Sequence, residues 1–309
     1  ALSDVVEEVG VPFTQEQLRE MGWALLGNPG FDVLTKIQEN AVRLVDYAGT
    51  SPLRGIVSGL NEAFIIDEET RGRLIAEDSK SDDILQPVRT GQDVRRYALE
   101  DPGTYLIYAT HGIDIDQYPA IRDHLRQYKE ELEGRATDQA WYELQQPQEA
   151  YEEKFKQPKI VQPDLAEEVR FHLDRDGVFT TNTAYFIPRD NWYLLAILNS
   201  QLINFFLAST SAEYRGGYMR LFGQYVEDIP IREIHFKTDE TEREAHVEAL
   251  TDAVEAARPH AAPADKGDGT SAVPTVLDAV DDHLDAGRTG VLHDLLAHLA
   301  RTMTRRKEE

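Results

Sequence analysis

Apolar residues recur at helical spacing near both ends of the chain. Val33, Leu34 and Ile37 predict a helix over residues 31–46, and a stripe of leucines predicts another over residues 275–303. Further helices are predicted at residues 14–26, 70–76, 119–133 and 241–257.

The middle of the chain has a different pattern, in which short apolar runs alternate with glycine-rich or polar turns. These runs predict strands at residues 56–66, 105–109, 159–162 and 178–187. Residues 191–207 are strongly apolar but include Asn199 and Asn204, which favours a core helix over a membrane span. We therefore predict an α+β fold, in which one mixed β-sheet packs on this core helix and helical segments flank it at both ends.

The same pattern divides the chain into three segments. We expect a helical N-terminal segment at residues 1–49, a mixed domain at 50–235 and a helical C-terminal segment at 236–309. Proline, glycine and alanine are frequent at residues 259–274, which predicts a flexible linker within the last segment.

Composition excludes several classes of protein. The chain has 309 residues, 41% of them hydrophobic, and no cysteine, so disulfides, thiolate zinc sites and a cysteine nucleophile are excluded. The N-terminus has neither the basic nor the apolar part of a signal peptide, and it lacks an initiator methionine. We expect a soluble, cytoplasmic fragment of a longer protein.

The chain is strongly acidic, because 32 basic and 56 acidic residues give a net charge of 32 − 56 = −24. Such acidity is typical of proteins from salt-loving microbes, where ions screen the repulsion between surface carboxylates. Residues 151–235 are the least acidic part, at 9 − 12 = −3. The net charge therefore does not exclude nucleic acid, and this part is the first place to look for a polyanion.

No defensible catalytic centre is present in the sequence. Asn28-Pro29-Gly30-Phe31 is one residue short of the Asn-Pro-Pro-Phe motif that holds a target amine, and an ordinary turn explains it better. Asp164, Glu167 and Glu168 faintly suggest a nuclease but lack the lysine, so a solvated loop is favoured. We predict no catalytic residue and no metal ligand here.

Polar residues in glycine-containing turns say more about function than these catalytic motifs do. Ser58 and Asn61 lie in such a turn beside a predicted buried strand, where a ligand can approach the backbone closely. Arginine and glutamine, which match guanine and adenine edges, cluster at residues 89–96, and an arginine follows the glycines at 216–217.

Taken in order, these segments resemble the TaqI-like specificity domain at the C-terminal end of adenine-specific DNA methyltransferases and fused restriction-modification enzymes. The resemblance covers residues 50–235. It is carried by GIVSGLNEAF at 55–64, GQDVRRY at 91–97, YPAI at 118–121, WYEL at 141–144, PKIV at 158–161, YLLAILNS at 193–200 and GGY at 216–218.

The resemblance implies a target recognition domain that binds double-stranded DNA and positions an adenine for a separate methyltransferase domain, to which residues 1–49 connect. The fragment itself is then inert, and S-adenosylmethionine, with Mg²⁺ if DNA is also cleaved, belongs to the parent enzyme. Arginine and glutamine would read bases and Lys159 would meet phosphate. The expected DNA-binding residues are Ser58, Asn61, Arg89, Gln92, Arg95, Arg96, Lys159, Asn182, Arg215 and Arg220.

Two other functions remain open from the residues alone. The chain could be a nuclease or another enzyme with an unrecognised site. It could also be a protein-interaction module whose helical ends dock a methyltransferase domain or a second copy, giving a homodimer.

Overall fold

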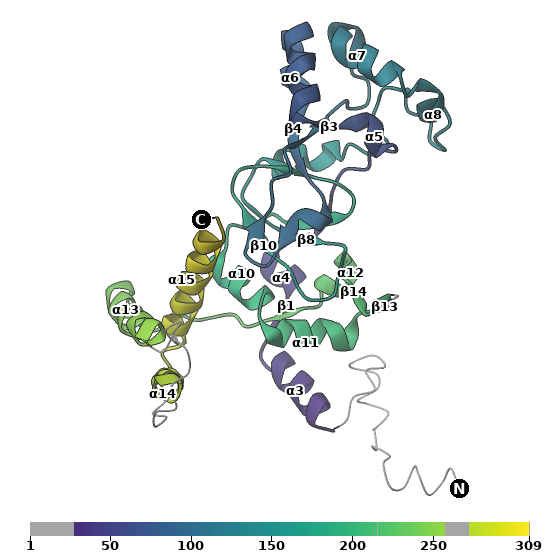
Figure 1. The fold of residues 1–309 in the computed structure, drawn as a ribbon. Coiled ribbons are helices and arrows are strands. Elements are labelled where there is room, and N and C mark those ends of the chain that lie inside the picture. The colour runs from purple at the N-terminus through teal and green to yellow at the C-terminus, as the bar shows by residue number, and fades with distance from the viewer. Residues whose placement is uncertain (1–27, 215, 257–271, 309) are drawn as a thin grey trace, which may run out of the picture.

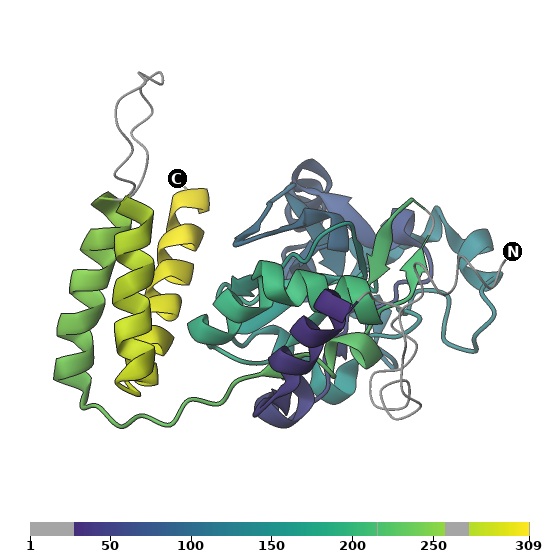
Figure 2. The same ribbon diagram turned by 90° about the horizontal axis from the view of Figure 1, so that it is seen from below.

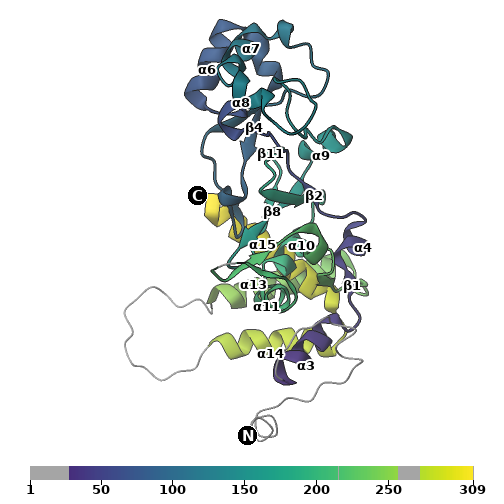
Figure 3. The same cartoon turned by 90° about the vertical axis from the view of Figure 1, so that its right-hand side faces the viewer.

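The computed structural model describes residues 28–214, 216–256 and 272–308. Within these ranges the protein is α+β, as predicted, with helices and several small sheets. Figures 1 and 3 show α6, α7 and α8 gathered at one end of the molecule and α3 at the other. Figure 2 shows the C-terminal helices lying beside the sheet-bearing body.

The first four-stranded sheet has the order β10-β8-β12-β2 and is antiparallel throughout. Its strands are β2 (Leu53–Arg54), β8 (Lys159–Pro163), β10 (His172–Asp174) and β12 (Ala184–Ile187). Every residue of β8 is buried, because the two faces of the sheet cover different cores. Val161 and Phe186 belong to one core, and Ile160 and Ile187 belong to the other.

The second four-stranded sheet has the order β11-β4-β7-β3 and is mixed, since β11 runs parallel to β4 while the other pairs are antiparallel. Its strands are β3 (Ile65–Asp67), β4 (Leu85–Arg89), β7 (Thr104–Ile107) and β11 (Phe179–Thr180). Helices pack beside it: α5 (Asn61–Phe64), α6 (Glu68–Glu77), α7 (Pro119–Arg126) and α8 (Lys129–Glu133).

The prediction of one sheet is therefore wrong. Residues 178–187 form two strands in different sheets, because the polar residues 181–183 turn the chain between β11 and β12. Residues 56–66 contain an isolated bridge at Ile56, then α5 and the start of β3. Strand β4 was not predicted, and it contains Pro87, a residue that weakens any strand assignment from sequence.

The predicted core helix is broken into α10 (Trp192–Leu198) and α11 (Gln201–Thr210), which bend by 56°. Asn199 is the C-cap of α10, and its side chain accepts from the Phe171 amide at 3.0 Å and donates to the Phe171 carbonyl at 2.8 Å. Ser200 then caps α11 by accepting from the Ile203 amide. In the described ranges no single helix meets the criteria of length and hydropathy for a membrane span, although this bent pair meets them jointly.

The N-terminal segment is also less regular than predicted. The helix expected at 31–46 is α3 (Asn28–Gln38), followed by β1 (Val42–Arg43) and α4 (Leu44–Ala48). Strand β1 pairs with β15 (Pro230–Ile231), near the end of the mixed domain, and Leu34 and Leu44 join its core. The domain boundaries stay predictions, and the helix expected at 14–26 lies outside the described residues.

Two predicted helices are confirmed, and one is divided. Helix α6 matches the prediction at 70–76, and α13 (Glu240–Ala256) matches that at 241–257. The predicted helix at 119–133 consists of α7 and α8, because the chain turns at residues 127–128.

The C-terminal helices form a small bundle. Its members are α13, α14 (Ala272–Asp285) and α15 (Thr289–Glu308), with Leu250, Val291 and Leu295 buried between them. The single helix predicted at 275–303 is wrong, since the chain turns between α14 and α15. Residues 272–274 of the predicted linker begin α14, while 259–271 lie outside the described residues.

Short elements complete the described fold. These are η1 (Ser79–Ile84), η2 (Gly91–Asp93), β5 (Val94–Arg95), β6 (Ala98–Leu99), η3 (Ile115–Gln117), η4 (Glu149–Tyr151), α9 (Glu152–Phe155), β9 (Leu165–Ala166), β13 (Glu213–Tyr214), β14 (Tyr218–Arg220) and α12 (Gly223–Val226).

Candidate nucleic-acid interface

A surface hollow of about 380 Å³, here called the amide hollow, brings together three of the predicted DNA-binding residues. Ser58 and Asn61 come from the turn that enters α5, and Asn182 comes from the turn between β11 and β12. The complete lining is Val57, Ser58, Gly59, Leu60, Asn61, Glu62, Gln145 and Asn182.

Backbone hydrogen bonds hold the two turns together. The Asn182 amide donates to the Ile56 carbonyl at 2.8 Å, and the Ile56 amide donates to the Thr180 carbonyl at 2.8 Å. The Val57 amide and the Gln146 carbonyl bond at 3.0 Å, which brings Gln145 to the same hollow. The positions of these side chains are therefore set by backbone pairing between segments far apart in sequence.

Arg135 holds in place the turn that carries Ser58. Its guanidinium donates to the carbonyl oxygens of Ser58 at 3.0 Å and Glu143 at 2.8 Å, and it also bonds the carbonyls of residues 132, 140 and 141. Gly59 has a φ of +85°, and a Cβ there would lie 2.7 Å from Arg135 Cδ. Burial lowers the pKa of Arg135, and the carboxylate of Glu143 opposes that shift.

The polar groups of the amide hollow are open to a ligand. Ser58 Oγ donates to Asn61 Oδ1 at 2.6 Å, so that hydrogen bond orients the Asn61 amide group. Within the described ranges, neither Asn61 Nδ2 nor the Asn182 side chain makes a hydrogen bond to the protein. Asparagine side chains offer both a donor and an acceptor, the combination that pairs with the edge of adenine.

Gln92 lies on the neighbouring turn, η2. The Gly91 amide donates to Thr183 Oγ1 at 2.9 Å, so this turn packs directly against the segment that carries Asn182. Thr90 and Asp93 fix the turn by a reciprocal capping box, and Gln92 itself is exposed.

Arg95 and Arg96 follow η2 and are held by exposed ion pairs. Arg95 contacts Glu100 at 2.9 Å, and Arg96 lies 3.5 Å from Glu168. Exposed ion pairs of this kind contribute only about 0–1 kcal/mol, so both guanidinium groups can exchange a carboxylate for a phosphate.

Arg220 approaches the same region from β14. Its register partner on β9 is Leu165, next to Asp164, whose amide donates to the Thr183 carbonyl at 2.9 Å. Burial raises the pKa of Asp164, and the charges of Arg54 and Arg220 oppose that shift. The Arg220 guanidinium also lies 5.1 Å from the centre of the Phe222 ring.

Two of the predicted residues do not reach this surface. The Arg89 side chain is only 7% exposed, and it bonds Asp101 at 2.7 Å and the Val88 carbonyl at 2.9 Å. Lys159 is fully buried against Asp174 and the Phe155 carbonyl, so the phosphate contact expected for it is incompatible with this structure. Arg215 lies outside the described residues.

Sequence reasoning missed Gln145, which lines the amide hollow, and Arg135, which supports it. Gln145 lies in an irregular polar stretch with no periodic signal. Arg135 lies in a similar stretch, and its role depends entirely on carbonyl groups that the fold brings to it.

Comparison with known proteins gives one family match and several distant relatives. Residues 86–231 match the model of the TaqI-like C-terminal specificity domain. The type II methyltransferase M.PaeR7I of Pseudomonas aeruginosa is 26% identical over 221 residues, which cover 68% of this chain and 37% of that protein. M.BstVI of Geobacillus stearothermophilus, also a type II methyltransferase, is 22% identical over 67% of this chain and 37% of that protein.

Among solved structures, the type IIL restriction-modification enzyme MmeI in complex with DNA superposes with a TM-score of 0.46 and 13% identity, over 83% of this chain and 36% of that one. The chain thus spans a little over a third of the length of the relatives it matches. The family match includes η2, Arg95, Arg96, Asn182 and Arg220 of the interface. Over residues 86–231 the chain is accordingly similar to the TaqI-like C-terminal specificity domains.

Proposed function

We propose that this chain reads a base sequence in duplex DNA as the recognition module of a longer N6-adenine DNA methyltransferase from a restriction-modification or phage-defence system. The observation that carries the proposal is the amide hollow, where Ser58 and Asn61 meet Asn182 of the matched family segment. Neutral hydroxyl and amide groups suit base edges, whose donors and acceptors differ from one base pair to the next.

The surrounding arginines supply the second part of the proposal. Arg95 lies on β5, Arg96 directly follows that strand, and Arg220 lies on β14; in this proposal their guanidinium groups neutralise DNA phosphates. They offset the repulsion that a chain with a net charge of −24 exerts on DNA. In this proposal the hollow supplies sequence preference and the arginines supply affinity.

Catalysis and S-adenosylmethionine are assigned to a domain outside this chain. Asn28 to Phe31 form the first turn of α3, so the prolyl carbonyl that would hold an amine is committed to the bonding pattern of the helix. These residues do not fit a methyl-transfer site. The methyltransferase relatives support a cofactor in the parent protein. The cytoplasmic location and the homodimer expected from the sequence stay predictions.

The first test is selection from a pool of random duplexes at about 0.1 M KCl and again at ~2 M KCl, followed by sequencing of the retained DNA. Recognition predicts the enrichment of one short motif. Folded protein that retains DNA without any enrichment would exclude sequence recognition by this chain. Folded protein that retains no DNA would be tested again with the full-length parent, and failure there would reject the proposal.

Substitutions then separate the two roles. Asn61→Ala or Asn182→Ala should reduce discrimination at one base pair of the motif by about 1–3 kcal/mol. The double variant Arg95→Ala/Arg96→Ala should weaken binding to all sequences alike and reduce the slope of log affinity against log salt by about two.

A matched control removes two arginines elsewhere. Arg73 and Arg126 are half-exposed and form only helix-surface ion pairs, with Glu77 and Asp123. Arg73→Ala/Arg126→Ala changes the net charge equally but should leave the affinity near that of the original protein. Equal losses in the two double variants would mean that only overall charge matters.

A further inference from the structure

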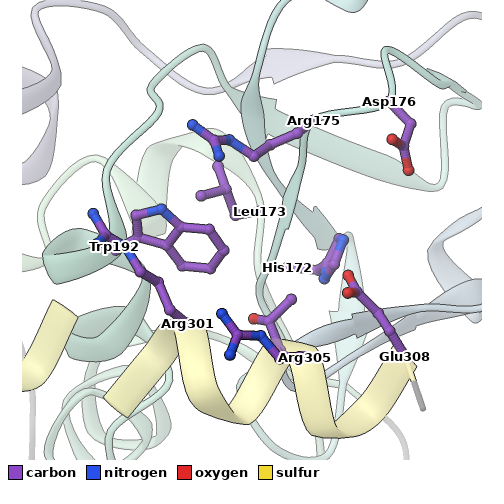
Figure 4. A pocket seen from close by; sticks show the side chains of 9 residues that line it. His172, Leu173, Arg175, Asp176, Trp192, Arg301, Arg305 and Glu308 are labelled. Atoms are coloured by element: carbon purple, nitrogen blue, oxygen red, sulfur yellow. The ribbon is translucent and has the colours of Figure 1, made fainter. Parts of the chain in front are cut away.

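A second pocket, of about 480 Å³, lies between the C-terminal helix and the body of the molecule. Strand β10 and the residues after it form one wall, Trp192 at the start of α10 forms another, and α15 closes the third. Figure 4 shows His172 directed toward α15, and Arg301 alongside the ring of Trp192. We call it the α15 pocket. It is lined by His172, Leu173, Arg175, Asp176, Trp192, Arg301, Thr304, Arg305 and Glu308.

Three guanidinium groups line the α15 pocket, an unusual concentration in so acidic a chain. Arg301 and Arg305 are exposed and make no ion pair within the described ranges, whereas Arg175 bonds Asp190 at 2.5 Å. The guanidinium carbons of Arg175 and Arg301 lie 5.7 and 5.8 Å from the centre of the Trp192 ring, which holds both side chains in place.

Two buried polar atoms in the α15 pocket have no hydrogen-bond partner in the protein. They are Nδ1 of His172 and Oγ1 of Thr304, on residues that are only 7% and 4% exposed. A buried polar atom without a partner is costly, so the two atoms point to a missing ligand that carries polar groups of its own. They lie on opposite walls, His172 on β10 and Thr304 on α15.

The charges in the pocket favour an anion of moderate size. Asp176 and Glu308 also line it, so three guanidinium groups face two carboxylates. Cations in the last turn of a helix ordinarily offset its dipole, which accounts for part of the charge of Arg305. That effect does not account for Arg301, which lies one turn earlier, or for the two unmet polar atoms.

We propose that the α15 pocket binds a phosphate group. Arg301 and Arg305 supply forked N–H donors, and the Thr304 hydroxyl supplies a third donor across the pocket from His172. A tetrahedral anion with several acceptor oxygens satisfies all three donors, and arginine forks match phosphate geometry. The group comes either from a free phosphate or from the DNA backbone. The site stands independently of the sequence recognition proposed above.

The test is isothermal titration with inorganic phosphate up to about 20 mM, the range that covers weak single-ion sites. We expect saturable binding that Arg305→Ala weakens at least tenfold and Thr304→Val weakens several-fold. Arg306→Ala is the matched control, because this neighbouring arginine faces away and bonds Glu255 at 3.1 Å. No saturable binding to the original protein, or equal losses in Arg305→Ala and Arg306→Ala, would overturn the proposal.

A second arm identifies the source of the phosphate. A random-sequence duplex is titrated against the original protein and against Arg305→Ala, with inorganic phosphate as competitor. If the pocket holds a backbone phosphate, Arg305→Ala weakens DNA binding equally for all sequences and phosphate competes with DNA. If it holds a free phosphate, the phosphate site is lost in Arg305→Ala while DNA affinity is unchanged. Either result supports the phosphate site. A selection experiment that shows no sequence preference would reject the proposed recognition function but would not affect the phosphate site.

Discussion

Lys159 and Asp174 form an ion pair from which water is excluded. Lys159 is completely buried and Asp174 is 2% exposed. Burial lowers the pKa of Lys159, and the carboxylate of Asp174 opposes that shift because it favours the charged ammonium. Asp174 also accepts the amides of Asp176 at 2.9 Å and Val178 at 3.1 Å. The pair therefore stabilises the junction between β10 and β11, and a lysine that looks like a phosphate ligand in the sequence is structural.

Breaking this pair should be costly. Asp174→Ala leaves a buried ammonium and two amides without their partner, so we expect a loss of about 3–5 kcal/mol in the free energy of unfolding. Urea titration followed by circular dichroism measures it.

Lys159→Met is the informative comparison. It removes the charge that needs a partner while Asp174 keeps its two amide donors, so the loss should be smaller than in Asp174→Ala. A larger loss in Lys159→Met would mean that the ammonium, and not the carboxylate, organises this junction.

At the level of elements, the turn at residues 181–183 organises the interface. It ends β11 in one sheet and begins β12 in the other, while its backbone bonds Ile56 and Arg89. Turn η2 packs so closely on it that a Cβ at Gly91 would lie 2.1 Å from the Thr183 carbonyl oxygen. The positions of Asn182 and Gln92 thus depend on one tight contact between two turns.

Gly91→Ala tests that contact. The added methyl meets backbone atoms that cannot move cheaply, so we expect a loss of about 1–3 kcal/mol in the free energy of unfolding. Because η2 carries Gln92 and precedes Arg95, DNA binding should weaken as well. Both are measured on the purified variant, by urea titration and by titration with duplex DNA.

Gly72→Ala serves as its control. Gly72 lies within α6, and a Cβ there meets nothing within 4 Å. The change should raise stability by about 0.5–1 kcal/mol, because alanine loses less backbone freedom in a helix. If Gly91→Ala and Gly72→Ala changed the free energy of unfolding in the same direction, close packing of η2 would not explain the effect of Gly91→Ala.

At the scale of the whole molecule, the dominant feature is the negative net charge. A net charge of −24 on 309 residues makes the folded state repel itself, most strongly when few ions are present. On α13, for example, Glu244 and Glu248 are both exposed and lie four residues apart, where like charges oppose each other.

Salt should therefore stabilise the protein. We expect the Tm to rise between about 0.1 and ~1 M KCl, as the Debye length falls from ~10 to ~3 Å. Differential scanning calorimetry measures it. The variant Glu244→Gln/Glu248→Gln should be more stable at low salt and gain less from KCl. A Tm independent of KCl would argue against an adaptation to high salt.

The sequence by itself determined the α+β class, the position of the longer helical segments and the side-chain chemistry of the candidate interface, because periodicity and side-chain type are local properties. Ser58, Asn61 and Asn182 could be selected from polar residues in turns, and the structure brings them into one hollow. The tertiary structure alone decided which cations are buried and which strand belongs to which sheet. Lys159 meets Asp174, Arg135 meets the Ser58 carbonyl, and residues 178–187 divide between two sheets. Each of these outcomes depends on partners distant in sequence, and burial or pairing by distant groups leaves no periodic trace in the chain.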